Sequence, residues 1–209
     1  MAPFSGVRLE RALIFTDRAE PGGYALYAYL LMERSADPAR RRAVLNVYLC
    51  DIRAAGTGQA TPRKGALIVP VATKAADYPV PGPGDLDRLM RDYDSYAAHD
   101  RLLDLVQQGR MKPSDLRPDG IYFGAFDQPI GAMPTRSAIY EISGLPQPAD
   151  VANWLLAERE DIELGRQVAT PGVQRVPSTA REILDGVGNA MADMLHIALP
   201  SAQAATVCE

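Results

Sequence analysis

Nine consecutive apolar residues, Tyr24–Met32, constrain the folding of this chain more than any other feature. Such a segment has no polar side to present to water, so the rest of the chain must cover it. It is much shorter than the roughly 20 apolar residues that span a bilayer, and we expect no membrane span. Because Leu, Ala and Met favour helices, we predict a buried helix over Tyr24–Arg34, although periodicity alone does not exclude a buried strand.

The rest of the composition is that of an ordinary globular protein. The 209 residues are 47% apolar and 23% charged, which argues against disordered and fibrous proteins. A formal net charge of −4 argues against a general nucleic-acid binder, because such binding depends on many basic contacts to phosphates. Only three of the 22 basic residues are lysine. This preference for arginine, together with abundant alanine, is typical of GC-rich bacterial genomes, so we expect a bacterial protein.

Residue patterns divide the chain into further strands and helices. Runs of branched and aromatic residues predict strands, whereas apolar residues at three- and four-residue steps predict helices. Asp37 is suited to cap the start of one helix, and Gly109 to end another. The predicted strands are Arg8–Phe15, Ala66–Val71, Ile121–Phe126 and Ser137–Ile142, and the further predicted helices are Pro38–Arg53, Asp85–Gln108, Pro148–Gly165 and Ser178–Ala198.

The order of these segments indicates the fold class. The strands do not alternate regularly with helices, which argues against a doubly wound or barrel fold. We therefore expect an α+β fold in which a small mixed sheet of about four strands packs with about four to five helices. Residues 1–209 are expected to form a single globular domain. Residues 199–209 lack a helix cap or a strand pattern, and we expect them to be an irregular C-terminal tail.

The N-terminal residues and the cysteines are the features that suggest a cellular compartment for the protein. The first residues contain no basic stretch followed by an apolar core, so no secretory signal is visible and we expect a cytoplasmic protein. A periplasmic protein is the alternative, if these residues were added to a mature exported chain. The two cysteines, Cys50 and Cys208, are too few for a disulfide scaffold. Cys50, near the end of a predicted helix, is expected to be an inert packed thiol.

Motifs for phosphate and metal binding are missing from the sequence. It contains no Gly-x-x-x-x-Gly-Lys-Ser/Thr loop and too few His and Cys residues at short spacing for a zinc site. Asp85, Asp87, Asp92 and Asp94 lie close together, but residues two apart on a helix point about 200° from each other. We therefore predict a solvated helix face with salt bridges at these aspartates, and we expect no metal and no cofactor.

One combination of residues has the composition of a catalytic triad. Asp92, Ser95 and His99 share one face of the predicted helix Asp85–Gln108. A working triad needs side chains that converge end to end beside an oxyanion hole, whereas residues along one helix face lie side by side. We therefore favour a surface histidine bonded to a neighbouring carboxylate, and keep catalysis as the alternative.

Tyrosine is the most frequent aromatic residue and suggests a surface for partners. Tyrosine combines an apolar ring with a polar tip and is enriched at protein interfaces. The alternative is that each hydroxyl finds a partner at the rim of the domain's own core. The candidate interaction surface consists of Tyr24, Tyr27, Tyr29, Tyr93 and Tyr96.

Three functional hypotheses follow. The leading one is a non-enzymatic protein-interaction or accessory subunit of a bacterial assembly, which binds a protein partner or a second copy of itself and no nucleic acid. The second is a hydrolase-type enzyme centred on His99, with Ser95 and Asp92 as candidate partners. The third is a small-ligand binding module with a pocket between the sheet and the Tyr24–Tyr29 segment.

Overall fold

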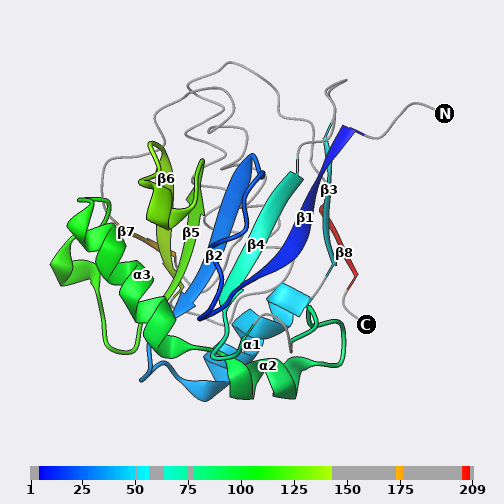
Figure 1. Ribbon diagram of the computed structural model, residues 1–209, viewed down its shortest axis with the longest axis horizontal. Coiled ribbons are helices and arrows are strands. Elements are labelled where there is room, and N and C mark those ends of the chain that lie inside the picture. The colour runs from blue at the N-terminus through cyan, green and yellow to red at the C-terminus, as the bar shows by residue number, and fades with distance from the viewer. Residues whose placement is uncertain are drawn as a thin grey trace.

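Eight strands form one mixed sheet in the computed structural model of the protein (Figure 1). The structure describes residues 5–49, 51–56, 64–74, 78–142, 173–176 and 204–207. The strands are β1 (Ser5–Ile14), β2 (Leu26–Met32), β3 (Asp51–Gly56), β4 (Lys64–Pro70), β5 (Ile121–Phe126), β6 (Ser137–Ile142), β7 (Val173–Val176) and β8 (Ala204–Val207). The α-helices in the described residues are α1 (Pro38–Leu49), α2 (Leu86–Asp92) and α3 (Ser95–Gln107), with short 3-10 turns at Pro113–Asp115 and Ile130–Ala132.

The sheet combines parallel and antiparallel pairs in the order β7-β6-β5-β2-β4-β1-β3-β8. Strand β4 runs parallel to both β1 and β2, while β5 runs antiparallel to β2 and to β6. The expected α+β class with a mixed sheet is confirmed, but the expected count of about four strands is wrong. The described residues contain three α-helices, fewer than expected, and the predicted helices Pro148–Gly165 and Ser178–Ala198 lie outside those residues.

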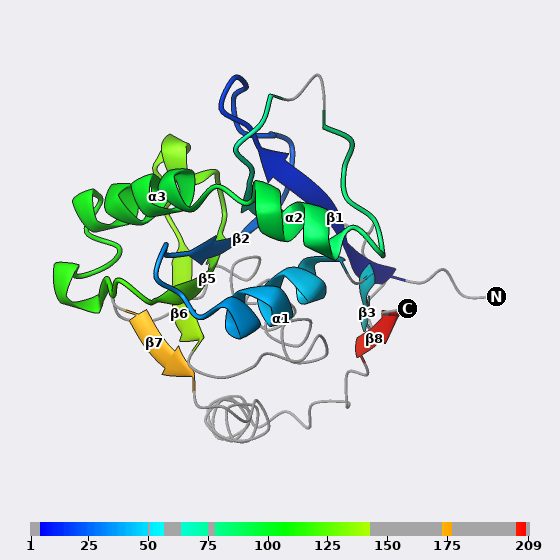
Figure 2. The same ribbon diagram turned by 90° about the horizontal axis from the view of Figure 1, so that it is seen from below.

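The apolar run Tyr24–Met32 contains strand β2, so the prediction of a helix over Tyr24–Arg34 is wrong. Strand β2 lies between β4 and β5, and all seven of its residues are buried. Helix α3 packs against it, and Figure 2 shows α3 and α1 on opposite sides of the sheet. A central strand covered on both faces loses the alternation of polar and apolar residues that marks a half-exposed strand. Coverage by neighbours therefore outweighed the helix propensity of its residues.

Helix α1 begins as predicted and ends early. The Asp37 carboxylate accepts a hydrogen bond from the backbone N–H of Arg40 at 2.9 Å, which satisfies one of the free amides of the first turn. The helix ends at Leu49 rather than at Arg53, because the following residues form β3 and pair with β1. The last turn is fixed to the sheet by the Arg11 guanidinium, which donates to the Leu49 carbonyl at 2.6 Å.

The predicted helix Asp85–Gln108 is two helices, α2 and α3, separated at Tyr93 and Asp94. Tyr93 has extended backbone, with a ψ of 127°, and forms an isolated bridge with Val71 beyond the end of β4. Its hydroxyl donates to the Leu30 carbonyl at 3.2 Å and accepts from the Met32 N–H at 2.7 Å. These buried contacts with β2 favour the break over a continuous helix.

Strands Arg8–Phe15, Ala66–Val71, Ile121–Phe126 and Ser137–Ile142 are confirmed as β1, β4, β5 and β6, with small differences at the ends of the first two. Gly109 follows α3 with a φ of 70°, as a helix-ending glycine does. The segment 199–209, expected to be irregular, contains strand β8, which pairs with β3. None of the helices in the described ranges is both long and apolar enough to cross a membrane.

The buried hydroxyl of Tyr93 gives the first prediction. Replacing Tyr93 with Phe leaves the Met32 N–H without its partner inside the core, and we expect the free energy of unfolding to fall by about 1 to 3 kcal/mol. Urea unfolding followed by circular dichroism measures the change. Tyr96→Phe is the matched control, since Tyr96 is 63% exposed, and should change stability by less than about 0.5 kcal/mol. Equal effects of the two substitutions would contradict this account of the helix break.

Candidate functional site

A buried carboxylate and a half-exposed histidine meet at the end of strand β2. Glu33 follows β2 directly, and its backbone N–H donates to the Gly120 carbonyl at 3.0 Å. Because α3 packs against β2, His99 comes within reach, and its Nδ1 lies 2.7 Å from the Glu33 Oε1 atom. The Glu33 side chain is 7% exposed and that of His99 41%. The pair therefore joins a group inside the protein to one that solvent reaches.

The structure does not bring the predicted triad together. Asp92 ends α2 and Ser95 begins α3, so the shared helix face is interrupted between them. The Asp92 carboxylate lies 3.1 Å from the Arg91 Nε atom and makes no described hydrogen bond or ion pair with His99. Ser95 and His99 remain on one helix, four residues apart, where side chains are neighbours. The carboxylate that contacts His99 is Glu33.

Glu33 could not be found from the sequence pattern. It stands 66 positions from His99, and it lies within the segment Tyr24–Arg34 that the pattern favoured as a helix. A carboxylate at the end of a nine-residue apolar run was the available signal, since such a position places a charge at the edge of the core. Using that signal required the run to be recognised as a central strand.

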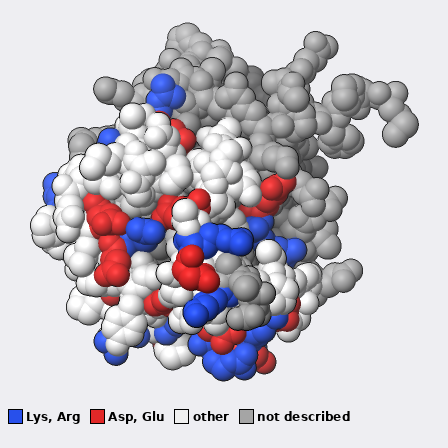
Figure 3. All heavy atoms as spheres, in the orientation of Figure 1, with Lys and Arg blue, Asp and Glu red and all other residues white. Residues whose placement is uncertain are grey.

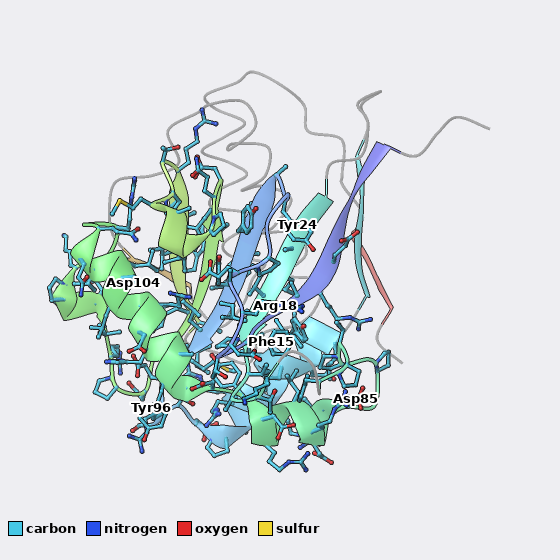
Figure 4. The ribbon with its side chains drawn as sticks, in the orientation of Figure 1. Phe15, Arg18, Tyr24, Asp85, Tyr96 and Asp104 are labelled. Carbon is cyan, nitrogen blue, oxygen red and sulfur yellow. The ribbon has the colours of Figure 1, made fainter. Side chains whose placement is uncertain are left out.

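An arginine and a tyrosine lie beside the histidine on the solvent side. The Arg34 guanidinium lies over the Tyr96 ring, 4.4 Å from its centroid, and Tyr96 precedes His99 by three residues on α3. Figure 4 shows Tyr96 at the start of α3, directed away from the sheet. Arg34 is exposed, and this ring contact is the interaction described for its side chain. Its guanidinium edge therefore has donors available to an anionic group.

A second buried carboxylate lies on the same part of the sheet. Glu141 of β6 is directly opposite Tyr122 of β5, and its Oε1 atom lies 3.5 Å from the Arg117 Nε atom. The pKa of the Tyr122 hydroxyl is raised to about 12: burial is the largest cause, the hydrogen bond from the Arg117 N–H lowers the pKa, and the charges of Glu141 and Glu33 raise it. The Tyr122 hydroxyl thus stays protonated and donates to the Asp115 carbonyl at 2.8 Å.

A third, partly buried carboxylate holds the connection between β1 and β2. The Glu20 side chain is 9% exposed; its Oε2 atom accepts from the Tyr29 hydroxyl at 2.9 Å, and its Oε1 atom lies 2.7 Å from the Arg101 Nε atom. The latter contact is an ion pair without an aligned hydrogen bond. Arg101 also pairs with Asp104 at 3.1 Å. Every one of these groups is engaged within the fold, so we regard this cluster as structural.

The tyrosine surface expected from the sequence is not formed as a whole. Tyr27, Tyr29 and Tyr93 are 4%, 0% and 6% exposed, because the first two lie in the central strand β2 and the third bonds to it. Tyr24 is partly buried, and Tyr96 is 63% exposed. Tyr96 is therefore the member of the predicted set that a partner can reach most fully.

Described charges of both signs occur on the face that Figure 3 shows. Figure 3 shows acidic and basic side chains interspersed over the visible face. Within the described ranges, no group of three or more His, Cys, Asp or Glu residues is arranged to hold a metal ion. The sequence matches no known family model, and no curated protein or solved structure matches it either.

Proposed function

We propose that the protein is a hydrolase-type enzyme in which His99 acts as a general base. The observation that supports this proposal is the 2.7 Å contact between His99 Nδ1 and the buried Glu33 carboxylate. An ionised carboxylate accepts hydrogen bonds only, so a neutral His99 carries its proton on Nδ1. The Nε2 atom then keeps a lone pair, and it has no hydrogen-bond partner among the described residues. A half-exposed imidazole held in this way is able to take a proton from a bound molecule.

Glu33 has two roles in this mechanism. It fixes the orientation and tautomer of the His99 ring, and its negative charge stabilises the imidazolium that forms when Nε2 accepts a proton. Its own position is secured by the backbone hydrogen bond to Gly120 at the end of β2. Glu33 thus takes the place that the sequence had suggested for Asp92.

The group that gives its proton to His99 in this mechanism is water rather than Ser95. A serine nucleophile needs free backbone amides nearby to bind the oxyanion that develops on the substrate. At the start of α3, the N–H groups of Tyr96 and Ala97 already donate to the Asp94 carboxylate, each at 3.0 Å. We therefore propose that His99 takes a proton from a water molecule, whose oxygen attacks the carbonyl or phosphoryl centre of an ester. The bond from that centre to the alcohol oxygen then breaks, and the alcohol leaves with the proton that His99 returns. Arg34, beside the site, would contact an anionic part of the substrate.

A panel of p-nitrophenyl carboxylic and phosphate esters tests this function. If His99 is the general base, His99→Gln should lower kcat/KM by about 100-fold or more, because proton transfer by a positioned side chain contributes at least that much. Glu33→Gln should lower it as well, since the amide does not stabilise the imidazolium. Asp92→Asn is the matched control and should retain activity, because Asp92 makes no described contact with His99. Hydrolysis that survives His99→Gln, or no turnover of any substrate by the wild type, would contradict the proposal.

An interaction role remains as a second candidate, and the exposure of Met133 favours it. Met133 is 73% exposed and has a φ of 56°, which is unusual for a residue other than glycine. Two residues that follow α3 hold the loop that carries Met133. Gln108 donates to the Ile130 carbonyl at 3.0 Å, and Arg110 donates to the Pro134 carbonyl at 2.6 Å. An exposed apolar side chain on a secured loop suits binding to a second copy of the chain or to another protein.

Light scattering coupled to size exclusion tests whether Met133 mediates self-association. If it does, the mass of the wild type should rise with concentration toward a dimer, and Met133→Glu should keep the protein monomeric. Val80→Glu is the control, because Val80 is also exposed, at 57%, and lies in a different segment. A wild type that stays monomeric at all concentrations would exclude self-association and leave a different protein as the only interaction partner to seek.

A further inference from the structure

Two consecutive residues after strand β2 contact two residues that lie one turn apart on helix α3. Glu33 contacts His99, and the Arg34 guanidinium lies 4.4 Å from the centroid of the Tyr96 ring. Tyr96 and His99 are three positions apart on α3, so their Cβ atoms are about 5 to 6 Å apart. A small molecule bound at the His99 ring is therefore within reach of the Arg34 guanidinium.

Arg34 carries a positive charge that no carboxylate among the described residues balances. Its side chain is exposed, and the Tyr96 ring is the partner described for it. The ring occupies one face of the guanidinium and restricts the motion of a long side chain. The N–H donors lie in the plane of the guanidinium, so the ring leaves them available. Arg34 therefore presents hydrogen-bond donors in a restricted position next to His99.

Arg117 lies nearby but is already engaged. The Ser35 N–H donates to the Pro118 carbonyl at 3.3 Å, which brings the segment after β2 beside the loop that carries Arg117. The Arg117 Nε atom lies 3.3 Å from the Asp119 Oδ1 atom and 3.5 Å from the Glu141 Oε1 atom. One described guanidinium is thus left here for a ligand. It balances a carboxylate, which has a single negative charge, better than a phosphate monoester, which has nearly two.

We propose that Arg34 binds a carboxylate of the substrate and that the protein hydrolyses esters of short dicarboxylic acids whose second carboxylate is free. This proposal rests on the proposed function, since the ester group must lie beside His99. The flat fork of a guanidinium pairs with both oxygens of a carboxylate at once. Because Tyr96 and His99 are neighbours on α3, the acyl chain that joins the carboxylate to the ester carbonyl is limited to a few methylene groups.

The free carboxylate stays in place during the reaction, because it belongs to the acyl part of the substrate. The water that gives its proton to His99 forms a bond from its oxygen to the ester carbonyl carbon, and the bond from that carbon to the alcohol oxygen breaks. The alcohol leaves with the proton that His99 returns, and the new acid group releases its remaining proton to solvent. Arg34 contacts the same carboxylate throughout, so it contributes to binding more than to the chemical step.

Three p-nitrophenyl esters with acyl chains of equal length test this specificity. Mono-p-nitrophenyl adipate ends in a carboxylate, the caproate ester in a methyl group and the aminocaproate ester in an ammonium group. We expect the wild type to prefer the adipate ester. Arg34→Gln should lower kcat/KM for that ester by about 10-fold, mainly through a higher KM, and leave the caproate ester unchanged.

Further variants separate the charge of Arg34 from its shape. Arg34→Lys keeps the charge but not the fork and should give an intermediate kcat/KM, whereas Arg34→Glu should shift the preference to the aminocaproate ester. Arg18→Gln is the matched control, because Arg18 is also exposed and Figure 4 shows it well apart from Tyr96. A preference for the adipate ester that survives Arg34→Gln would overturn the proposal.

Binding of a substrate analogue separates this proposal from the general-base role of His99. Adipamic acid carries the same free carboxylate but an amide in place of the ester, and NMR titration of the backbone amides measures its Kd. We expect the wild type to bind it about 10-fold more tightly than Arg34→Gln does, and both to bind the neutral caproamide alike. Carboxylate-dependent binding without turnover of any ester would retain the Arg34 site and overturn hydrolysis. Turnover that depends on His99 but treats the three esters alike would retain the general base and overturn the role of Arg34.

Discussion

The complete burial of strand β2 is the constraint on which the rest of the described structure depends. All seven of its residues lie out of water, and it pairs with β4 on one side and β5 on the other. The N–H of its last residue, Met32, donates a hydrogen bond to the Tyr93 hydroxyl. The chain leaves the core at Glu33. The position of that carboxylate is therefore set by the ladder of the central strand rather than by a mobile loop.

Helix α3 supplies the partners that two of the carboxylates at the sheet need. A carboxylate withdrawn from water is costly unless a partner compensates it. Three nearly buried glutamates lie in or beside the sheet: Glu20 pairs with Arg101, Glu33 with His99, and Glu141 with Arg117. The first two partners both belong to α3. The same contacts that attach α3 to the sheet thus create the candidate site. Of these partners, only histidine has a ring nitrogen with a lone pair that can accept a proton, which distinguishes the Glu33 pair from the other two.

Local chemistry was enough to predict some elements, and long-range contacts decided the others. The strand at Ile121–Phe126 and the cap at Asp37 depend on neighbouring residues, and both were predicted correctly. The helix over Tyr24–Arg34 was wrong because burial on two faces is a property of the whole sheet. The break at Tyr93 was missed for a similar reason, since its hydroxyl bonds to a strand more than 60 positions away. His99 was identified from its residue type, but the carboxylate beside it required the fold.

The tautomer of His99 is the most direct test of the central claim, which is that Glu33 orients the ring for acid–base chemistry. Long-range proton–nitrogen NMR correlation of the histidine ring distinguishes which nitrogen carries the proton at neutral pH. Only His99 and His196 contribute, so His196→Gln leaves a single signal to assign. If Glu33 holds Nδ1, the neutral ring should carry its proton on Nδ1, and Glu33→Gln should weaken that preference. A ring protonated on Nε2 in the wild type, the usual preference of free histidine, would contradict the account.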